Sequence, residues 1–525
     1  MSEHENANAA LYFVDRNASG DLANKPAFIE ADGAQRQITY GALAEQSDRM
    51  ADLYEKHGII RESRAAMLVL DQIEFPIIFW GSLKAGIVPV AINTLLVSEI
   101  YQTILSDSRS QILFVSHALL PTVAPILSKL PDLKCVFVIG GEQAGEVDHE
   151  SGGERDHLNF SRALADCSPR PAIAANADES AFWLYSSGST GQPKGVRHVH
   201  GSLKFTADTY GAKVLGIDRN DVVYSAAKFF FAYGLGNAMT FPMSVGATTV
   251  LMSGRPTPDS VVDVLNTYKP NIFCGVPTLY AALVAHLNGG KARLETKLTK
   301  CISAGEALPE EVGKSWEKLS GTEILDGVGS TEMLHIFLSN QPGDVVYGTS
   351  GVAVPGYEIR VVNEAGDETE IGEIGELLVN GDSAAADYWN QRQKSRETFE
   401  GVWTRTGDKY EKRRDGRLVY CGRTDDMFKV SGIWVSPFEV EQALSAHPSV
   451  LEAAIVPARD DQDLEKPKAF VVLNEGVQSS GIDVELKEHV QAQIGKWKYP
   501  RWVEVVDELP KTATGKIQRF KLRED

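Results

Sequence analysis

The sequence predicts an α/β protein with a large N-terminal domain of βαβ-type sheets, including a β-rich subdomain, and a small α+β C-terminal domain. Three observations lead to this fold class. Apolar runs of strand length alternate with helical stretches in the first half, strand-and-turn patterns follow over residues 340–420, and the chain after Arg423 has apolar elements of its own. We therefore expect one domain over residues 1–424 and a second over residues 425–525.

The first half alternates strands with helices. Apolar runs of strand length occur at residues 65–70, 86–92, 111–116 and 135–140. A buried helix is expected from Ile73 to Ala85, and the alternation implies a parallel sheet covered on both faces. Residues 141–180 are polar and rich in glycine and acid, so we expect a surface excursion there, followed by a strand at 181–187.

The C-terminal domain is expected to contain a helix, two strands, a helix and a final strand. These elements correspond to residues 437–450, 451–458, 468–474, 484–494 and 501–506. The tail is locally basic: between Lys496 and Arg523 there are eight Lys or Arg against three Asp or Glu.

The composition is that of a globular protein, with 43% hydrophobic and 23% charged residues. A net charge of −19 disfavours non-specific binding to nucleic acid or to an anionic membrane. The five scattered cysteines form no C-x-x-C pair, which is typical of reduced thiols, and the polar N-terminus does not resemble a signal peptide. We therefore expect a cytoplasmic protein with neither nucleic acid nor membrane as partner.

One uncharged stretch, residues 229–251, is long enough to cross a bilayer. Several glycines, hydroxyl residues and Pro242 interrupt it. We therefore expect two buried segments joined by turns rather than a membrane span.

The stretch YSSGSTGQPKG, residues 185–195, has glycines, hydroxyls and one lysine that suit a polyphosphate. It is not a Walker loop, G-x-x-x-x-G-K-[ST], because Pro193 replaces the second glycine and Gly195 follows the lysine. A glycine-rich turn after a strand nevertheless exposes backbone N–H groups to a ligand. The residues concerned are Ser186, Ser187, Gly188, Ser189, Thr190, Gly191 and Lys194.

Four further polar motifs follow along the chain. In GVGSTE, residues 327–332, Thr331 could hold a phosphate and Glu332 a metal ion. The others are Thr406-Gly-Asp408, GRTDDMFKVSG at 422–432, and PKTATGKI at 510–517. Each alone is also explained as an ordinary turn, a helix cap or a solvated lysine.

All five motifs together, in this order, resemble the adenylate-forming superfamily of acyl-CoA synthetases, peptide-synthetase adenylation domains and luciferases. The resemblance covers nearly the whole chain. Three segments are similar more specifically to benzoate–CoA ligases and their hydroxybenzoate relatives: residues 225–249, 329–340 and 422–441.

The resemblance implies an ATP site. Residues 186–194 would be a mobile loop over the β- and γ-phosphates, Thr331 would contact the α-phosphate, and Glu332 would bind Mg²⁺. Asp408 would bind the ribose hydroxyls with Arg423 nearby. The adenine site would be lined by Ser303, Ala304, Gly305, Glu306, Asp326 and Gly327. The chain departs from the superfamily at Val328, where an aromatic residue is usual, so adenine would stack on an aliphatic side chain or on another residue.

The resemblance also implies a mobile C-terminal domain. Lys516 would enter the site for adenylation and leave it for thioester formation, with a hinge at Asp425. Lys429, Ser431 and Gly432 would then approach the pantetheine channel of coenzyme A. Lys516 is also a candidate acetylation site for a lysine acetyltransferase and deacetylase, and a homodimer stays open.

The acyl pocket is expected from two segments: Phe231, Ala232, Tyr233 and Gly236, and then Gly329, His335 and Ile336. The first segment has no acidic residue, which argues against an amino-acid substrate. Aromatic residues of this kind are also common in plain protein cores. His198 and His200 share a strand face and could bind a metal, but no third ligand lies nearby in the sequence.

The resemblance implies an AMP-forming acid–thiol ligase that uses ATP, Mg²⁺ and coenzyme A to activate a small aromatic carboxylic acid. Two alternatives stay open at this point. One is an aryl-adenylating enzyme that loads a carrier protein in trans, and the other is a catalytically silent nucleotide-binding regulator. We expect benzoate or a small ring-substituted benzoate to be preferred over acetate and long-chain fatty acids.

Overall fold

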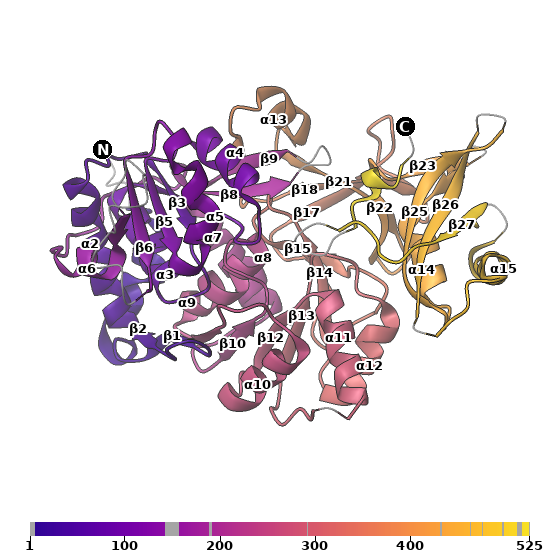
Figure 1. The fold of residues 1–525 in the computed structure, drawn as a ribbon, viewed down its shortest axis with the longest axis horizontal. Coiled ribbons are helices and arrows are strands. Elements are labelled where there is room, and N and C mark those ends of the chain that lie inside the picture. The colour runs from indigo at the N-terminus through magenta and orange to yellow at the C-terminus, as the bar shows by residue number, and fades with distance from the viewer. Residues whose placement is uncertain are drawn as a thin grey trace. The chain divides into compact units, whose positions relative to one another are not determined.

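The structure, a computed structural model, describes residues 6–141, 157–187, 192–290, 292–430, 433–461, 464–474, 476–495, 498–511 and 517–523. The chain forms two compact units (Figure 1). The larger unit comprises Met1–Glu358 and Val379–Thr404, and the smaller comprises Ile359–Leu378 and Arg405–Asp525. The larger unit contains two mainly parallel sheets with helices, so the predicted fold class is confirmed.

The first sheet of the larger unit holds both strands that flank residues 186–194, which we call the phosphate loop after its predicted role. Its order is β19-β9-β8-β4-β3-β5-β6-β7. Pairing is parallel from β8 to β7 and antiparallel for β8–β9 and β9–β19. The strands are β3 (Arg64–Leu68), β4 (Val88–Ala91), β5 (Ile112–Ser116), β6 (Cys135–Ile139), β7 (His157–Asn159), β8 (Ser180–Ser187), β9 (Pro193–Val199) and β19 (Asp387–Tyr388).

The strands predicted in the first half are confirmed as β3, β4, β5, β6 and β8. Every residue of β5 is buried, as expected of a strand covered on both faces. The polar stretch 141–180 differs from the expectation of a plain surface excursion. Residues 142–156 lie outside the described chain, but β7 and α6 (Phe160–Ala165) fall within the stretch. Asn159 caps α6 by accepting a hydrogen bond from the Arg162 N–H at 2.9 Å. A single capping residue is difficult to recognise in a polar stretch of sequence.

The second sheet of the larger unit has the order β16-β15-β14-β13-β12-β10-β11-β1-β2. Its centre is parallel, and both edges are antiparallel. The strands are β1 (Pro26–Glu30), β2 (Gln37–Thr39), β10 (Val222–Ser225), β11 (Thr248–Leu251), β12 (Ile272–Gly275), β13 (Lys300–Ser303), β14 (Ile324–Gly329), β15 (Ile336–Ser339) and β16 (Val352–Ala353). Parallel strands end at one edge, which places the polar ends of β13 and β14 side by side.

Helices of the larger unit connect these strands. The predicted helix from Ile73 is confirmed as α3, which ends where Gly86 adopts a φ of 70°. The α-helices are α1 (Ala9–Phe13), α2 (Tyr40–Lys56), α3 (Glu74–Ala85), α4 (Ser98–Ser108), α5 (Leu120–Val123), α7 (His200–Thr206), α8 (Ala232–Leu235), α9 (Phe241–Val245), α10 (Pro258–Tyr268), α11 (Pro277–Asn288), α12 (Glu310–Ser320) and α13 (Arg392–Thr398). The 3-10 helices are η1 (Asp15–Asn17), η2 (Gly20–Leu22), η3 (His117–Leu119) and η4 (Ala124–Lys129), and the π-helices are η5 (Ala207–Val214) and η6 (Gly236–Thr240).

The uncharged stretch 229–251 consists of α8, the π-helical η6, α9 and then β11. This agrees with the prediction of two buried segments joined by a turn. Among the described residues, no helix is both long and apolar enough to cross a bilayer.

The smaller unit carries the predicted helix-strand-strand-helix-strand order. These elements are α14 (Pro437–Ser445), β25 (Val450–Arg459), β26 (Glu465–Leu473), α15 (Ile482–Ile494) and β27 (Trp502–Val505). β26 pairs antiparallel with β25 and parallel with β27. The remaining elements of this region are β17 (Glu358–Val362), β18 (Ile374–Asn380), β21 (Trp403–Lys412), β22 (Leu418–Arg423), β23 (Phe428–Val430), β24 (Ile433–Val435) and η7 (Arg519–Lys521). The short strand β20 (Phe399–Glu400), which pairs with β21, belongs to the larger unit.

The compact smaller unit therefore takes in much of the β-rich segment that the sequence assigned to the N-terminal domain. The division into compact units does not show which part of the chain moves. The boundary at residues 424 and 425, proposed as the place where the C-terminal domain moves, stays a prediction.

Candidate active site

The ends of the phosphate loop form an antiparallel hairpin. Ser186 near the end of β8 pairs with Lys194 at the start of β9, and Ser187 pairs with Pro193. Gly188, Ser189, Thr190 and Gly191 at the tip lie outside the described residues. The hairpin thus brings Lys194 to the position from which its side chain reaches the β14–β15 loop.

A compact charged cluster centres on Glu332. The Lys194 ammonium lies 3.7 Å from Glu332 Oε1, and the Tyr388 hydroxyl donates a hydrogen bond to the same oxygen at 2.7 Å. Lys194 Nζ also lies 4.4 Å from the centre of the Tyr388 ring. Side-chain exposure is only 12% for Lys194 and 16% for Glu332, so water screens this pair less than it would screen a surface pair. Tyr388 was not among the predicted site residues.

The loop that carries Glu332 is held in a tight conformation. A Cβ at Gly329 would lie 2.4 Å from the backbone oxygen of His335, so only glycine fits where the loop closes on itself. Leu334 has a φ of 65°, and its N–H donates to the Thr331 carbonyl. His198 Nε2 donates to the same carbonyl at 2.9 Å. The loop therefore sets the position of Thr331, Glu332 and His335 together.

His198 and His200 have separate structural partners. Burial lowers the pKa of His198 to about 4, so the ring is neutral when it braces Thr331. His200 accepts a hydrogen bond from the Ala9 N–H through Nδ1 at 3.1 Å.

The predicted adenine-site residues converge where β13 and β14 end. Ser303 and Asp326 are paired neighbours in the parallel register, and Ala304, Gly305 and Glu306 follow β13 directly. Burial raises the pKa of Asp326 to about 8, so this acid is mostly protonated at neutral pH and can donate a hydrogen bond. Val328 is half-buried and Gly327 is buried.

Buried aromatic rings surround His335, and we call this cluster, with Gly236, the aromatic slot after its predicted role. The His335 ring centroid lies 5.8 Å from that of Tyr233, and a Cβ on Gly236 would lie 2.3 Å from His335 Cδ2. Burial lowers the pKa of His335 to about 3, and Nε2 donates a weak hydrogen bond to the Tyr233 carbonyl at 3.3 Å. Ile336 begins β15 beside Gly327.

Two residues of this slot were missed by the sequence reasoning. The Phe241 ring lies 4.5 Å from His335, edge to face, and the Tyr210 ring lies 5.1 Å away. Tyr210 lies in the π-helix η5, and Phe241 directly follows the π-helix η6. A π-helix has a wider turn than an α-helix, so Gly236 and Phe241, five residues apart, face the same side of the helix. The predicted member Ala232 begins α8, and Phe231 is its N-cap residue, whose ring lies 4.4 Å from that of Phe230.

The predicted residues of the smaller unit form clusters of their own. Arg423 donates to Asp408 Oδ1 at 3.0 Å across the β21–β22 pair. The Asp425 carbonyl accepts from Arg523 at 3.1 Å, and Lys429 lies 3.0 Å from Glu364. The predicted residues Ser431, Gly432 and Lys516 lie outside the described residues.

Comparison with known proteins connects these features. Residues 14–389 match the AMP-binding enzyme family, and residues 439–516 match the AMP-binding enzyme C-terminal domain. The chain is 50% identical to a 4-hydroxybenzoate–CoA/benzoate–CoA ligase of Rhodopseudomonas palustris, over 98% of this chain and 94% of that protein. It is also 50% identical to a benzoate–CoA ligase of Thauera aromatica, over 99% and 96%.

One solved structure supports the same family assignment. A benzoate CoA ligase from Burkholderia xenovorans is 45% identical to this chain, covers 98% of it with all of its own length, and superimposes with a TM-score of 0.88. The resemblance inferred from the motifs is therefore confirmed.

Proposed function

Since the chain belongs to the AMP-binding enzyme family, we propose that it is an ATP-dependent aryl-CoA ligase. It activates benzoate or a substituted benzoate as an acyl-adenylate with release of pyrophosphate, and then transfers the acyl group to coenzyme A with release of AMP. Two relatives at 50% identity are a 4-hydroxybenzoate–CoA/benzoate–CoA ligase and a benzoate–CoA ligase, which favours coenzyme A over a carrier protein as the acceptor.

One observation carries the proposal: a buried aromatic slot and a charged cluster share a single short loop. His335 lines the slot, and Glu332, three residues earlier, belongs to the cluster with Lys194. A flat ring in the slot would thus have its carboxylate near the groups suited to bind phosphates. The residues recorded against His335 in this slot are Tyr210, Tyr233, Gly236 and Phe241, and none of them is acidic, which favours an aromatic acid over an amino acid.

In the first step, the substrate carboxylate attacks the α-phosphorus of ATP, and the bond to pyrophosphate breaks. A benzoate is already ionised at neutral pH, so the step needs no general base, only in-line placement and stabilisation of charge. Lys194 is well placed to contribute positive charge. We assign Thr331 to the α-phosphate, Asp326 and Ser303 to adenine, and Asp408 to the ribose.

The residues present fit a magnesium ion. Mg²⁺ commonly uses one or two carboxylates and takes its other ligands from substrate phosphates and water. Glu332 offers one carboxylate, and the described residues contain no group of three or more side chains that could form a complete protein cage. When bound, the ion would neutralise charge on the phosphates.

In the second step, the coenzyme A thiol loses its proton, and its sulfur displaces AMP from the acyl-adenylate. We assign Lys516 to the first step only, and Asp425 to the hinge that removes it. Lys429 would then face the channel for coenzyme A. A cytoplasmic location, a dimer and acetylation of Lys516 remain proposals that rest on the sequence.

Two assays test the proposal. Benzoate-dependent exchange between ATP and pyrophosphate reports the first step, and formation of benzoyl-CoA from a supplied benzoyl-adenylate reports the second. A panel of benzoate, 4-hydroxybenzoate, 2-aminobenzoate, acetate and decanoate should place a benzoate first in kcat/KM. A higher kcat/KM for acetate or decanoate would overturn the substrate class.

The role of Lys516 has its own test. Lys516→Ala should lower exchange about 100-fold or more, because one charge donor is lost, and should spare thioester formation from the adenylate. Equal losses in both steps would contradict the assignment.

A further inference from the structure

A short segment, residues 385–389, connects two parts of the charged cluster that are far apart in sequence. The Ala385 N–H donates to the Glu332 carbonyl at 2.7 Å, and the Trp389 N–H donates to the Gly195 carbonyl at 2.8 Å. Between them, Asp387 forms a two-pronged ion pair with Arg197 of β9. We call residues 385–389 the strap.

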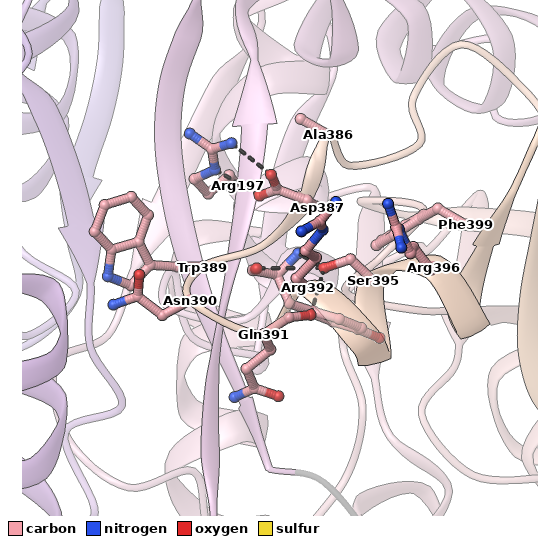
Figure 2. Close-up of a pocket in the computed structure, with 11 residues that line it drawn as sticks. Arg197, Ala386, Asp387, Trp389, Asn390, Gln391, Arg392, Ser395, Arg396 and Phe399 are labelled. Carbon is pink, nitrogen blue, oxygen red and sulfur yellow. Dashed lines mark hydrogen bonds and ion pairs between the residues drawn. The ribbon is translucent and has the colours of Figure 1, made fainter.

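The strap is braced from outside by α13. The Ser395 hydroxyl accepts from the Tyr388 N–H at 3.0 Å and lies within hydrogen-bond distance of the Gln391 carbonyl. Figure 2 shows Ser395 beside the strap and the ion pair between Arg197 of β9 and Asp387 of β19. These residues line a surface pocket of about 490 Å³. The strap is therefore held on both sides, and the Tyr388 side chain reaches the Glu332 cluster with only 4% of the residue's surface exposed.

We propose that Tyr388 is a positioning residue for the metal–nucleotide site, because its hydroxyl sets the orientation of the Glu332 carboxylate while its ring supports the Lys194 ammonium. This inference rests on the proposed function, since it assigns the cluster to ATP and a divalent cation. Tyr388 and Lys194 both contact Oε1 of this carboxylate. Oε2 is the oxygen we assign to the cation.

The physical reason lies in the flexibility of glutamate. A glutamate side chain has three rotatable bonds, and much of its freedom is lost when it binds a cation. A hydrogen bond from a buried phenol to a carboxylate is charge-assisted and short, and it selects one rotamer before the cation arrives. Tyr388 itself cannot turn easily, because the Phe399 ring lies 5.3 Å from its own and the strap fixes its backbone.

The test compares Tyr388→Phe with Tyr40→Phe. The first substitution keeps the aromatic ring that supports Lys194 and removes only the hydroxyl. Tyr40 is also fully buried and donates one hydrogen bond, to the Ala247 carbonyl at 2.6 Å, away from Glu332, so it controls for the loss of a buried hydroxyl. Mn²⁺ binding to the enzyme–ATP complex, followed by electron paramagnetic resonance without any carboxylic acid, is the main measurement.

We expect Tyr388→Phe to weaken Mn²⁺ binding about 10-fold, as loss of one charge-assisted hydrogen bond implies. ATP binding in the presence of EDTA should be unchanged, and Tyr40→Phe should match the wild type in both measurements. Equal Mn²⁺ affinity in Tyr388→Phe and wild type would overturn the proposal. So would an equal loss of ATP binding with and without the cation, which indicates general distortion.

Two further variants keep the result interpretable. Ser395→Ala removes the brace from the Tyr388 N–H and should weaken Mn²⁺ binding in the same direction but less. In a Glu332→Gln background, Tyr388→Phe should have no further effect on Mn²⁺ binding, because the carboxylate it orients is gone; additive losses would contradict the assignment. If wild-type enzyme binds Mn²⁺ and ATP but activates no benzoate, the substrate assignment is wrong, and the role proposed for Tyr388 is still tested by the Mn²⁺ measurements.

Discussion

Substitution of Gly236 by alanine tests the aromatic slot with a single methyl group. Gly236 has a helical φ of −65°, so alanine is compatible with the backbone. The added Cβ would lie 2.3 Å from His335 Cδ2 and 2.7 Å from Nε2, with Phe241 Cζ at 3.0 Å. The methyl group therefore enters the slot itself and changes little else.

The size of the effect follows from these distances. Carbon atoms in contact stand about 3.5–4.0 Å apart, so the His335 ring must retreat by about 1 Å or more. It has little room, because Tyr233 and Phe241 pack against it and its Nε2 is hydrogen-bonded. Overpacking costs about 1–3 kcal/mol, and replacing a helical glycine returns about 0.5–1 kcal/mol, so net destabilisation should be about 1 kcal/mol. A substrate displaced by about 1 Å should lose about 100-fold in kcat/KM.

The assay is benzoate-dependent ATP–pyrophosphate exchange, with the melting temperature measured in parallel. Gly201→Ala in α7 is the matched control, because its Cβ would meet its nearest neighbours, the Ala177 oxygen and Cβ, at an ordinary 3.5 and 3.6 Å. We expect unchanged kcat/KM for Gly201→Ala and a large loss for Gly236→Ala that is smaller for acetate than for benzoate. A Gly236→Ala enzyme within about twofold of wild type on benzoate would refute the placement of the ring beside His335.

Other predictions concern stability and movement. Burial raises the pKa of Asp71 to about 6, so the folded protein holds a proton that the unfolded chain releases near pH 4, and stability falls as pH rises between these values. Asp71→Asn should therefore be more stable than wild type by about 3 kcal/mol at pH 7 and show no such advantage below pH 4, measured by urea unfolding. Lys84 is 1% exposed and ion-paired with Asp15 and Asp48, so Lys84→Met should lose about 3 kcal/mol in the same assay; no loss would contradict a stabilising role. Asp425→Pro should spare pyrophosphate exchange and impair transfer to coenzyme A, because proline restricts φ at the expected hinge; unimpaired overall turnover would count against a hinge there.

Much of the fold was predictable because parallel strands buried on both faces give unbroken apolar runs. β3, β5 and β6 are of this kind. Within the stretch 141–180, β7 and α6 escaped prediction because they are short, with three and six residues, and lie beside polar sequence. The grouping of the β-rich segment with the C-terminal elements could not be read from periodicity, because it depends on contacts between distant residues such as the Lys429–Glu364 ion pair.

Candidate site residues could be named from the sequence where they belong to a contiguous motif. Lys194, Thr331, Glu332 and Asp326 belong to such motifs. In the structure Lys194, near the start of β9 in one sheet, lies 3.7 Å from Glu332, which follows β14 of the other sheet. Tyr388 and Phe241 were missed for a common reason: an aromatic residue on a strand or helix has no local pattern that separates a core role from a role in a site. Only the hydrogen bond from Tyr388 to Glu332, and the ring contact from Phe241 to His335, make the distinction.

The β14–β15 loop has a consequence for how the acid is selected. Glu332 and His335 lie on one tight loop, in which Leu334 has a left-handed φ of 65° and Gly329 has no space for a Cβ, so we expect their positions to be coupled. A ring that displaces His335 therefore also disturbs the carboxylate beside Lys194. Discrimination between acids should then appear in kcat as well as in KM, since a poorly fitting ring misplaces the charged groups needed in the transition state. Equal kcat values for acids that differ widely in KM would contradict this coupling.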